Sequence, residues 1–201
     1  MSRHIFARLF TRQATCIVLG VGLWLGSVRA AQDDLAGIVL VNGRPQKDVV
    51  VWLDGGTARS SPNPKKIVLD QRHLQFKPHV LAVRVGAQVE MPNSDRVFHN
   101  VFSFHNGKRF DLGLYPVGTA KTVTFDRPGL SRVFCNIHPN MAAYVLAVDS
   151  AYFAVSDSQG QFAMGGVPTG SYTYHAWRPG GETRTGTVAV EAGRRLEIRW
   201  P

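Results

Sequence analysis

The amino-acid sequence predicts an all-β protein, and three observations support that prediction. Apolar and polar residues alternate with a period of two along short segments, as they do in strands with one face in a core. Turn sequences such as Asn42-Gly43 and Pro128-Gly129 separate those segments. Beyond residue 30 no segment shows an apolar stripe with helical spacing. Many short strands joined by such turns are typical of a sandwich with Greek-key connections.

The first 30 residues differ from the rest of the chain. Arg3, Arg8 and Arg12 precede an apolar run over residues 14–28, and Ala30 follows at a position suited to cleavage. This order predicts a secretory signal peptide over residues 1–30. The run is short for a membrane span, so we expect no stable membrane insertion after cleavage, with an uncleaved anchor as the alternative. We therefore expect a periplasmic protein.

The chain expected after cleavage has 171 residues, 19 basic and 14 acidic side chains, and a formal net charge of +5. That length allows one large or two small domains. Basic pairs such as Lys65-Lys66 lack interleaved aromatic residues, so we expect no nucleic-acid binding. Because Cys16 would leave with the signal peptide, Cys135 would be the only cysteine.

Alternation predicts seven strands in the mature chain. They cover residues 38–41, 49–53, 80–85, 97–104, 121–125, 131–135 and 143–148. In the predicted strand over residues 97–104, alternation places His99 on one face with Val97 and Val101. In the predicted strand over residues 131–135, Cys135 shares a face with Val133, and a short loop then leads to the next strand. Two neighbouring strands and this loop can bring His99 and Cys135 to one point.

The residues around Cys135 predict a metal site. His138 and Met141 follow it in the spacing Cys-x-x-His-x-x-Met, and His99 lies upstream. A lone thiol in an oxidising compartment has no internal disulfide partner, and metal ligation would protect it. One thiolate, two imidazoles and one thioether suit a blue-copper electron-transfer site. Zinc is the alternative metal, but a thioether is a poor ligand for it.

The same residues resemble the cupredoxin family. The upstream His99-Asn100 and the Cys-x-x-His-x-x-Met run after a strand ending in an aromatic residue carry this resemblance, which covers about residues 67–149. The spacing is most similar to the amicyanin branch, and longer runs resemble exported plastocyanin-like or methylamine-utilisation proteins. The resemblance implies a Greek-key cupredoxin sandwich with one copper ion. His99, Cys135 and His138 would bind it, with Met141 as a weak axial ligand.

The resemblance also implies that Asn100 braces the ligand loop by hydrogen bonding near the cysteine sulfur, which would tune the site. Phe134, next to the thiolate, is either part of the packing along an electron path or an ordinary core aromatic.

The flanking segments resemble a carboxypeptidase-regulatory-like, transthyretin-type β-sandwich. Asn42-Gly43 and the strand after it carry the resemblance on the N-terminal side, and the run from Gly166 to Tyr172 carries it on the C-terminal side. If both belong to one module, the strands of residues 31–61 and 150–201 enclose a copper domain over residues 62–149. The alternative is a single sandwich that the C-terminal strands extend.

Together these patterns predict a periplasmic blue copper protein that carries single electrons. Its expected partners are redox proteins such as a dehydrogenase, an oxidase or a cytochrome c. Paired carboxylates, a Ser-His-Asp set and a phosphate-binding glycine loop do not stand out, so we expect no enzymatic activity. A copper storage or delivery protein and an envelope binding module with a structural metal are the alternatives. Redox titration distinguishes the first alternative, and metal removal distinguishes the second.

Overall fold

The computed structural model describes residues 32–55, 66–104 and 106–201, in which all the regular structure is β-strand. The all-β prediction is confirmed. No helix that is long and apolar enough to cross a bilayer occurs in the described part of the chain. The predicted signal peptide over residues 1–30 and the predicted boundary between residues 61 and 62 lie outside the described residues.

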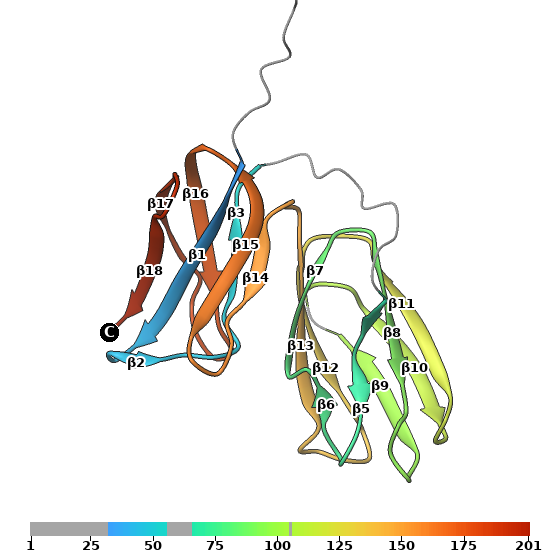
Figure 1. Ribbon diagram of the computed structural model, residues 1–201. Coiled ribbons are helices and arrows are strands. Elements are labelled where there is room, and N and C mark those ends of the chain that lie inside the picture. Colours follow the sequence, from blue (N-terminus) through green and yellow to red (C-terminus); the bar gives the residue numbers. More distant parts are fainter. Residues whose placement is uncertain (1–31, 56–65, 105) are drawn as a thin grey trace, which may run out of the picture.

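The strands form two β-sandwiches, seen on the left and the right of Figure 1. The flanking sandwich consists of two sheets. One has the order β15-β1-β18, and β2 also pairs with its strand β1; the other has the order β14-β3-β16-β17. Its strands are β1 (Gln32–Val41), β2 (Arg44–Pro45), β3 (Val50–Leu53), β14 (Phe153–Val155), β15 (Gln161–Pro168), β16 (Gly170–Trp177), β17 (Arg184–Val190) and β18 (Arg195–Trp200).

The inserted sandwich has a five-stranded sheet in the order β10-β9-β12-β13-β7 and a three-stranded sheet in the order β11-β8-β4. A short hairpin of β5 and β6 lies beside them. Its strands are β4 (Ile67–Val68), β5 (Asp70–Gln71), β6 (Phe76–Lys77), β7 (Val80–Arg84), β8 (Ala87–Pro92), β9 (His99–Ser103), β10 (Phe110–Tyr115), β11 (Ala120–Phe125), β12 (Gly129–Phe134) and β13 (Ala142–Val148).

The chain passes through the flanking sandwich twice. It leaves after β3 and returns at β14, and these two strands pair antiparallel with Phe153 opposite Trp52. In the sequence, strands β4 to β13 therefore form an insertion between β3 and β14, which are neighbouring strands of the flanking sandwich.

A Greek-key connection positions the two segments that carry the predicted ligands. After the β9–β10 hairpin, the chain crosses to the other sheet as β11 and returns as β12 beside β9. Phe134 of β12 lies opposite Phe102 of β9, and the two strands run antiparallel. The beginning of β9 and the end of β12 consequently meet at one end of the inserted sandwich.

Each of the seven predicted strands coincides with an observed strand, whereas other strands, among them β8 and β10 of the inserted sandwich, were not among the seven. In β10 the alternation is broken by a bulge between Asp111 and Leu114, where Gly113 has a positive φ of 62°. The Asn42-Gly43 turn between β1 and β2 has positive φ at both residues, as a tight hairpin turn requires.

Each sandwich has its own apolar core. Phe125 and Val101 lie in the core of the inserted sandwich, and Leu53 and Ile198 lie in the core of the flanking sandwich. A third cluster joins the two, with Val50 from one side and Leu146 from the other. Partly buried aromatic residues complete this cluster: Trp52, Tyr144, Phe153 and Trp177.

Candidate metal centre

The loop between β12 and β13 presents Cys135 and His138. In β12 the side chains of Ser131 and Val133 point inward and are fully buried, and the same alternation turns Cys135 inward. Two backbone hydrogen bonds close the loop, from Met141 N to the His138 carbonyl (2.9 Å) and from Cys135 N to the Met141 carbonyl (3.3 Å). The loop is thus fixed at both ends before any metal binds.

His99 is the first residue of β9 and is fully buried, opposite Tyr115 of β10. Val101 lies buried in the same strand, as predicted. The prediction that Val97 shares this buried face is wrong, because β9 begins only at His99 and Val97 is 43% exposed in the preceding loop. His99 therefore enters the core at the point where the loop becomes a strand.

Three donor atoms meet where these segments converge. His99 Nδ1 lies 3.0 Å from His138 Nδ1, and Cys135 Sγ lies 3.8 Å from the first and 3.6 Å from the second. Ligand nitrogens lie about 2.0 Å and thiolates about 2.3 Å from a bound ion, so two ligands of one ion are at most about 4.3 Å apart. All three separations fit within that limit. The described residues contain one such cluster of His, Cys, Asp or Glu donors.

Asp95 orients His99. Its Oδ2 atom lies 3.2 Å from His99 Nε2 and accepts a hydrogen bond from Leu74 N at 2.7 Å, while Oδ1 accepts one from Arg96 N at 3.1 Å. A proton on Nε2 that is donated to this carboxylate leaves Nδ1 with a free lone pair facing the other two donors. The Leu74 N–H, with His99 and Arg96, holds the pKa of Asp95 below its usual range, against the opposing effect of burial.

Asn93 organises the loop that carries Asp95. Its side chain is buried and donates to the carbonyls of Val97 (2.8 Å) and Tyr115 (3.2 Å), and its Oδ1 accepts from Asp95 N (3.0 Å). The last of these bonds is an Asx turn, for which Asn is a preferred residue. The sequence alone did not predict these roles of Asn93 and Asp95.

Asn100 does not brace the ligand loop in the way the resemblance implied. Its Nδ2 donates to Asp111 Oδ1 at 2.8 Å, and the same oxygen accepts from Gly113 N at 2.8 Å. Asn100 Oδ1 is buried and has no hydrogen-bond partner in the described structure. Asn100 thus anchors the bulge of β10, because the bulge brings Asp111 within reach.

Met141 is buried in the same core cluster as Cys135. This position is compatible with the predicted axial role, which stays a prediction. Phe134 is partly buried and lies 6.0 Å from Phe102, ring centre to ring centre.

A buried polar network lies behind the site. Tyr115 Oη donates to the Met91 carbonyl at 3.0 Å and accepts from Gln71 Nε2 at 2.6 Å, and Gln71 Nε2 also donates to the Pro92 carbonyl at 3.0 Å. Burial raises the pKa of Tyr115 to about 12, and the Gln71 hydrogen bond opposes that rise. The network ties the β5–β6 hairpin to β8 and β10, and its member Tyr115 is the β10 residue that pairs with His99.

Exposed apolar side chains lie on the surface around the three donors, at this end of the inserted sandwich. His138 is partly exposed, whereas His99 and Cys135 are buried. Ile137 directly precedes His138, and Val97 and Phe98 directly precede His99. Six of the seven exposed large apolar side chains in the described residues belong to the segments around the site, and we call these six the apolar rim: Leu74, Val97, Phe98, Leu114, Val117 and Ile137.

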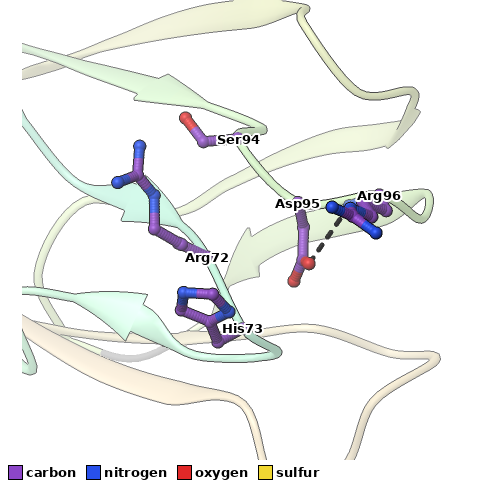
Figure 2. A pocket seen from close by; sticks show the side chains of 5 residues that line it. All are labelled: Arg72, His73, Ser94, Asp95 and Arg96. Carbon is purple, nitrogen blue, oxygen red and sulfur yellow. Dashed lines mark hydrogen bonds between the residues drawn. The ribbon is translucent and has the colours of Figure 1, made fainter.

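A polar depression of about 490 Å³ adjoins the rim. Figure 2 shows Arg72 and His73 on one side of it and Asp95 and Arg96 on the other, with Ser94 between them. His73 and Leu74 both have positive φ, 56° and 55°, because they form the two-residue turn of the β5–β6 hairpin. The bond from Leu74 N to Asp95 helps to hold this otherwise unfavourable turn.

Comparison with protein families gives a partial match. The family described as "Polysaccharide lyase family 4, domain II" matches residues 142–198, which run from β13 into β18. This stretch is less than half of the chain, and the family differs from the carboxypeptidase-regulatory-like module that the sequence predicts for the flanks. Comparison with curated proteins finds no match.

Several solved structures are similar to part of the chain. A "novel purple cupredoxin" from Nitrosopumilus maritimus is 23% identical, with a TM-score of 0.38, over 41% of this chain and 100% of that chain. A copper-containing nitrite reductase from Thermus scotoductus SA-01 is 22% identical, with a TM-score of 0.41, over 47% of this chain and 25% of that chain. A Cu(I) amicyanin mutant is 20% identical, with a TM-score of 0.40, over 49% of this chain and 98% of that chain.

Proposed function

We propose that this protein is a periplasmic blue copper protein that carries single electrons between exported redox proteins and is not an enzyme. His99, Cys135 and His138 would bind one copper ion, with Met141 as a weak axial ligand. The observation that carries the proposal is the convergence of one thiol and two imidazole nitrogens within 3.8 Å of one another. Bound copper would supply a one-electron couple between Cu(I) and Cu(II).

The donor chemistry favours copper over zinc. The thiolate of Cys135 is a soft ligand, and the imidazoles of His99 and His138 suit both oxidation states of copper. Structural zinc sites are closed by four Cys, His or carboxylate ligands, and the described residues offer three such donors at this point.

Rigidity of the ligands supports electron transfer rather than metal transport. His99 is fully buried and hydrogen-bonded to Asp95, and the backbone N–H of Cys135 donates a hydrogen bond to the Met141 carbonyl. Ligands that are held in place before metal binding rearrange little when the charge of the site changes. A transport protein would instead need ligands that open to release their metal.

His138 would be the route for electrons. Its Nδ1 faces the other donors while part of the ring reaches the surface, within the apolar rim. An exposed apolar patch of this kind marks an interaction surface on a soluble protein. A redox partner that covers the rim would exclude water and come close to the imidazole edge.

Copper loading with a redox titration tests the proposal. We expect the metal-free protein to bind one Cu(II) per chain, to turn intensely blue through thiolate ligation, and to undergo reversible one-electron reduction. His138→Gln should abolish the colour, whereas His175→Gln in the flanking sandwich should keep it. A colourless protein that binds only Cu(I) would overturn the electron-carrier proposal in favour of storage or delivery.

A further inference from the structure

The positive charge of this protein is concentrated in the inserted sandwich. Residues 66–149 contain ten basic and six acidic side chains, a formal net charge of +4, whereas the remaining mature residues carry a net charge of +1. This asymmetry alone favours an acidic partner for the inserted sandwich. The positions of the charged side chains around the metal centre indicate where such a partner would bind.

Two carboxylates next to the apolar rim, Asp95 and Asp70, are turned inward. Asp95 has a side chain that is 14% exposed, and it accepts from Leu74 N, Arg96 N and His99 Nε2. Asp70 is 19% exposed and pairs with Arg72 at 3.3 Å. Neither carboxylate is therefore well placed to meet a partner.

The cations at the same end point outward. The side chain of Arg72 is 54% exposed despite its pairing with Asp70, and Arg96 is exposed and has no ion-pair partner in the described structure. Both line the 490 Å³ depression together with His73. The loop between β10 and β11 and the loop that carries His138 contain no charged side chain other than that histidine. A partner approaching the metal centre therefore meets an apolar surface with cations on one side of it.

We propose that the redox partner is an acidic protein, and that one of its carboxylate side chains enters the depression between Arg72 and Arg96 while its apolar surface covers the rim. This inference rests on the proposed function. Continuity is the reason for assigning one partner to both features, since Leu74 and Val97 of the rim directly adjoin His73 and Arg96 of the depression. Charge at such a position raises the association rate and orients the encounter more than it adds to affinity.

A binding experiment on the metal-free protein tests this docking surface without relying on redox activity. The probes are two c-type cytochromes, one with carboxylates around its exposed haem edge and one with lysines there. NMR titration of the labelled chain at low ionic strength should show binding of the acidic cytochrome, with shifts in the apolar rim and the depression. High salt should weaken that binding.

Charge-reversal variants give the decisive comparison. Arg96→Glu should weaken binding of the acidic cytochrome by about tenfold at low ionic strength, Arg72→Glu by somewhat less, and Arg96→Lys should restore most of it. Arg127→Glu is the matched control, because Arg127 has the same charge, is 60% exposed and lies in the turn between β11 and β12 at the opposite end. Equal binding of both cytochromes, or equal effects of Arg96→Glu and Arg127→Glu, would overturn the inference.

Electron-transfer rates of the copper-loaded protein separate this inference from the proposed function. If reversible electron transfer occurs but shows no preference for the acidic cytochrome, the docking inference fails and the electron-carrier proposal stands. If the metal-free protein shows the charge-selective binding but the loaded protein does not exchange electrons, the electron-carrier proposal fails instead.

Discussion

The two sandwiches share an all-β architecture but bury different kinds of side chain. The inserted sandwich buries a cluster of polar groups at one end, next to its cysteine. These groups are Gln71, Asn93, His99 and Asn100, whereas Ser103 and Ser131 are buried towards the other end of the same sheet. In the described part of the flanking sandwich and its junction, the buried polar residues are Ser150 and Ser156, and both bond to nearby backbone.

This difference coincides with the position of the candidate metal centre, which lies in the inserted sandwich. Burying polar groups costs free energy unless they are hydrogen-bonded, so a concentration of them needs a chemical or structural reason. In the inserted sandwich the network orients His99 and fixes the surrounding loops. The flanking sandwich has an apolar core and contacts its neighbour through β3 and β14, away from the ligand end of the fold.

Removal of the proposed thiolate ligand, Cys135, should have the largest effect, and the effect should be confined to the site. We expect Cys135→Ser to abolish the blue colour completely while costing only about 1–2 kcal/mol of stability, because a hydroxyl can still hydrogen-bond at this position. Visible absorption and thermal unfolding measure the two effects. A chelator should likewise remove the colour from the wild-type protein and leave it folded.

If either change unfolds the inserted sandwich, the metal is a structural staple, and the proposal of a preformed electron carrier is contradicted.

Core truncations should show how far the two sandwiches are independent. Phe125→Ala, in the core of the inserted sandwich, should cost about 3–5 kcal/mol and weaken metal binding. Ile198→Ala, in the core of the flanking sandwich, should cost about 2–5 kcal/mol and leave the metal spectrum unchanged in the folded protein. Calorimetry with copper spectra measures both. A spectrum altered equally by the two variants would show that the flanking core shapes the site.

Alkaline pH should destabilise the inserted sandwich through Tyr115. Its pKa is about 12 in the folded protein against 10.0 ordinarily, because the phenol is buried. The stabilisation is therefore complete below pH 10 and is lost as the pH rises towards 12, with a ceiling of about 3 kcal/mol. Denaturant unfolding of the metal-free protein across this range measures the slope. Tyr115→Phe should reduce it, and an unchanged slope in that variant would exclude Tyr115 as the cause.

A smaller effect is expected from the carboxylate that orients His99. Asp95→Asn should lower copper affinity by about 10- to 100-fold, because the amide orients the imidazole less strongly and does not raise its basicity. Asp126→Asn is the matched control, since Asp126 is exposed and pairs with Lys108 near the opposite end of β12. Competition with a chelator measures both affinities. Equal copper affinities of the two variants would show that Asp95 does not contribute to metal binding.

The sequence predicted the parts of the structure that depend on local pattern. Alternation located seven strands, and the spacing from Cys135 to His138 led to two of the three converging donors. Within a short loop, sequence spacing nearly determines spatial distance. The placement of His99 also followed, because β12, which ends directly before Cys135, lies beside the strand of His99.

Other contacts between distant segments were not predicted. Asp95 is bound by Leu74, 21 residues earlier, and this contact depends on where the β5–β6 turn lies against the loop after β8. The partner of Asn100 depends on a bulge in β10, and alternation does not locate bulges. The exposure of Val97 depended on where β9 begins, and strand ends are the least certain feature of such a pattern.

X-ray absorption at the copper edge of the loaded, full-length protein tests the central claim most directly. We expect one sulfur at short distance and two imidazole nitrogens around a single copper ion, with the sulfur absent in Cys135→Ser. A copper ion surrounded only by nitrogen and oxygen in the wild-type protein would contradict the assignment of Cys135, His99 and His138 as its ligands.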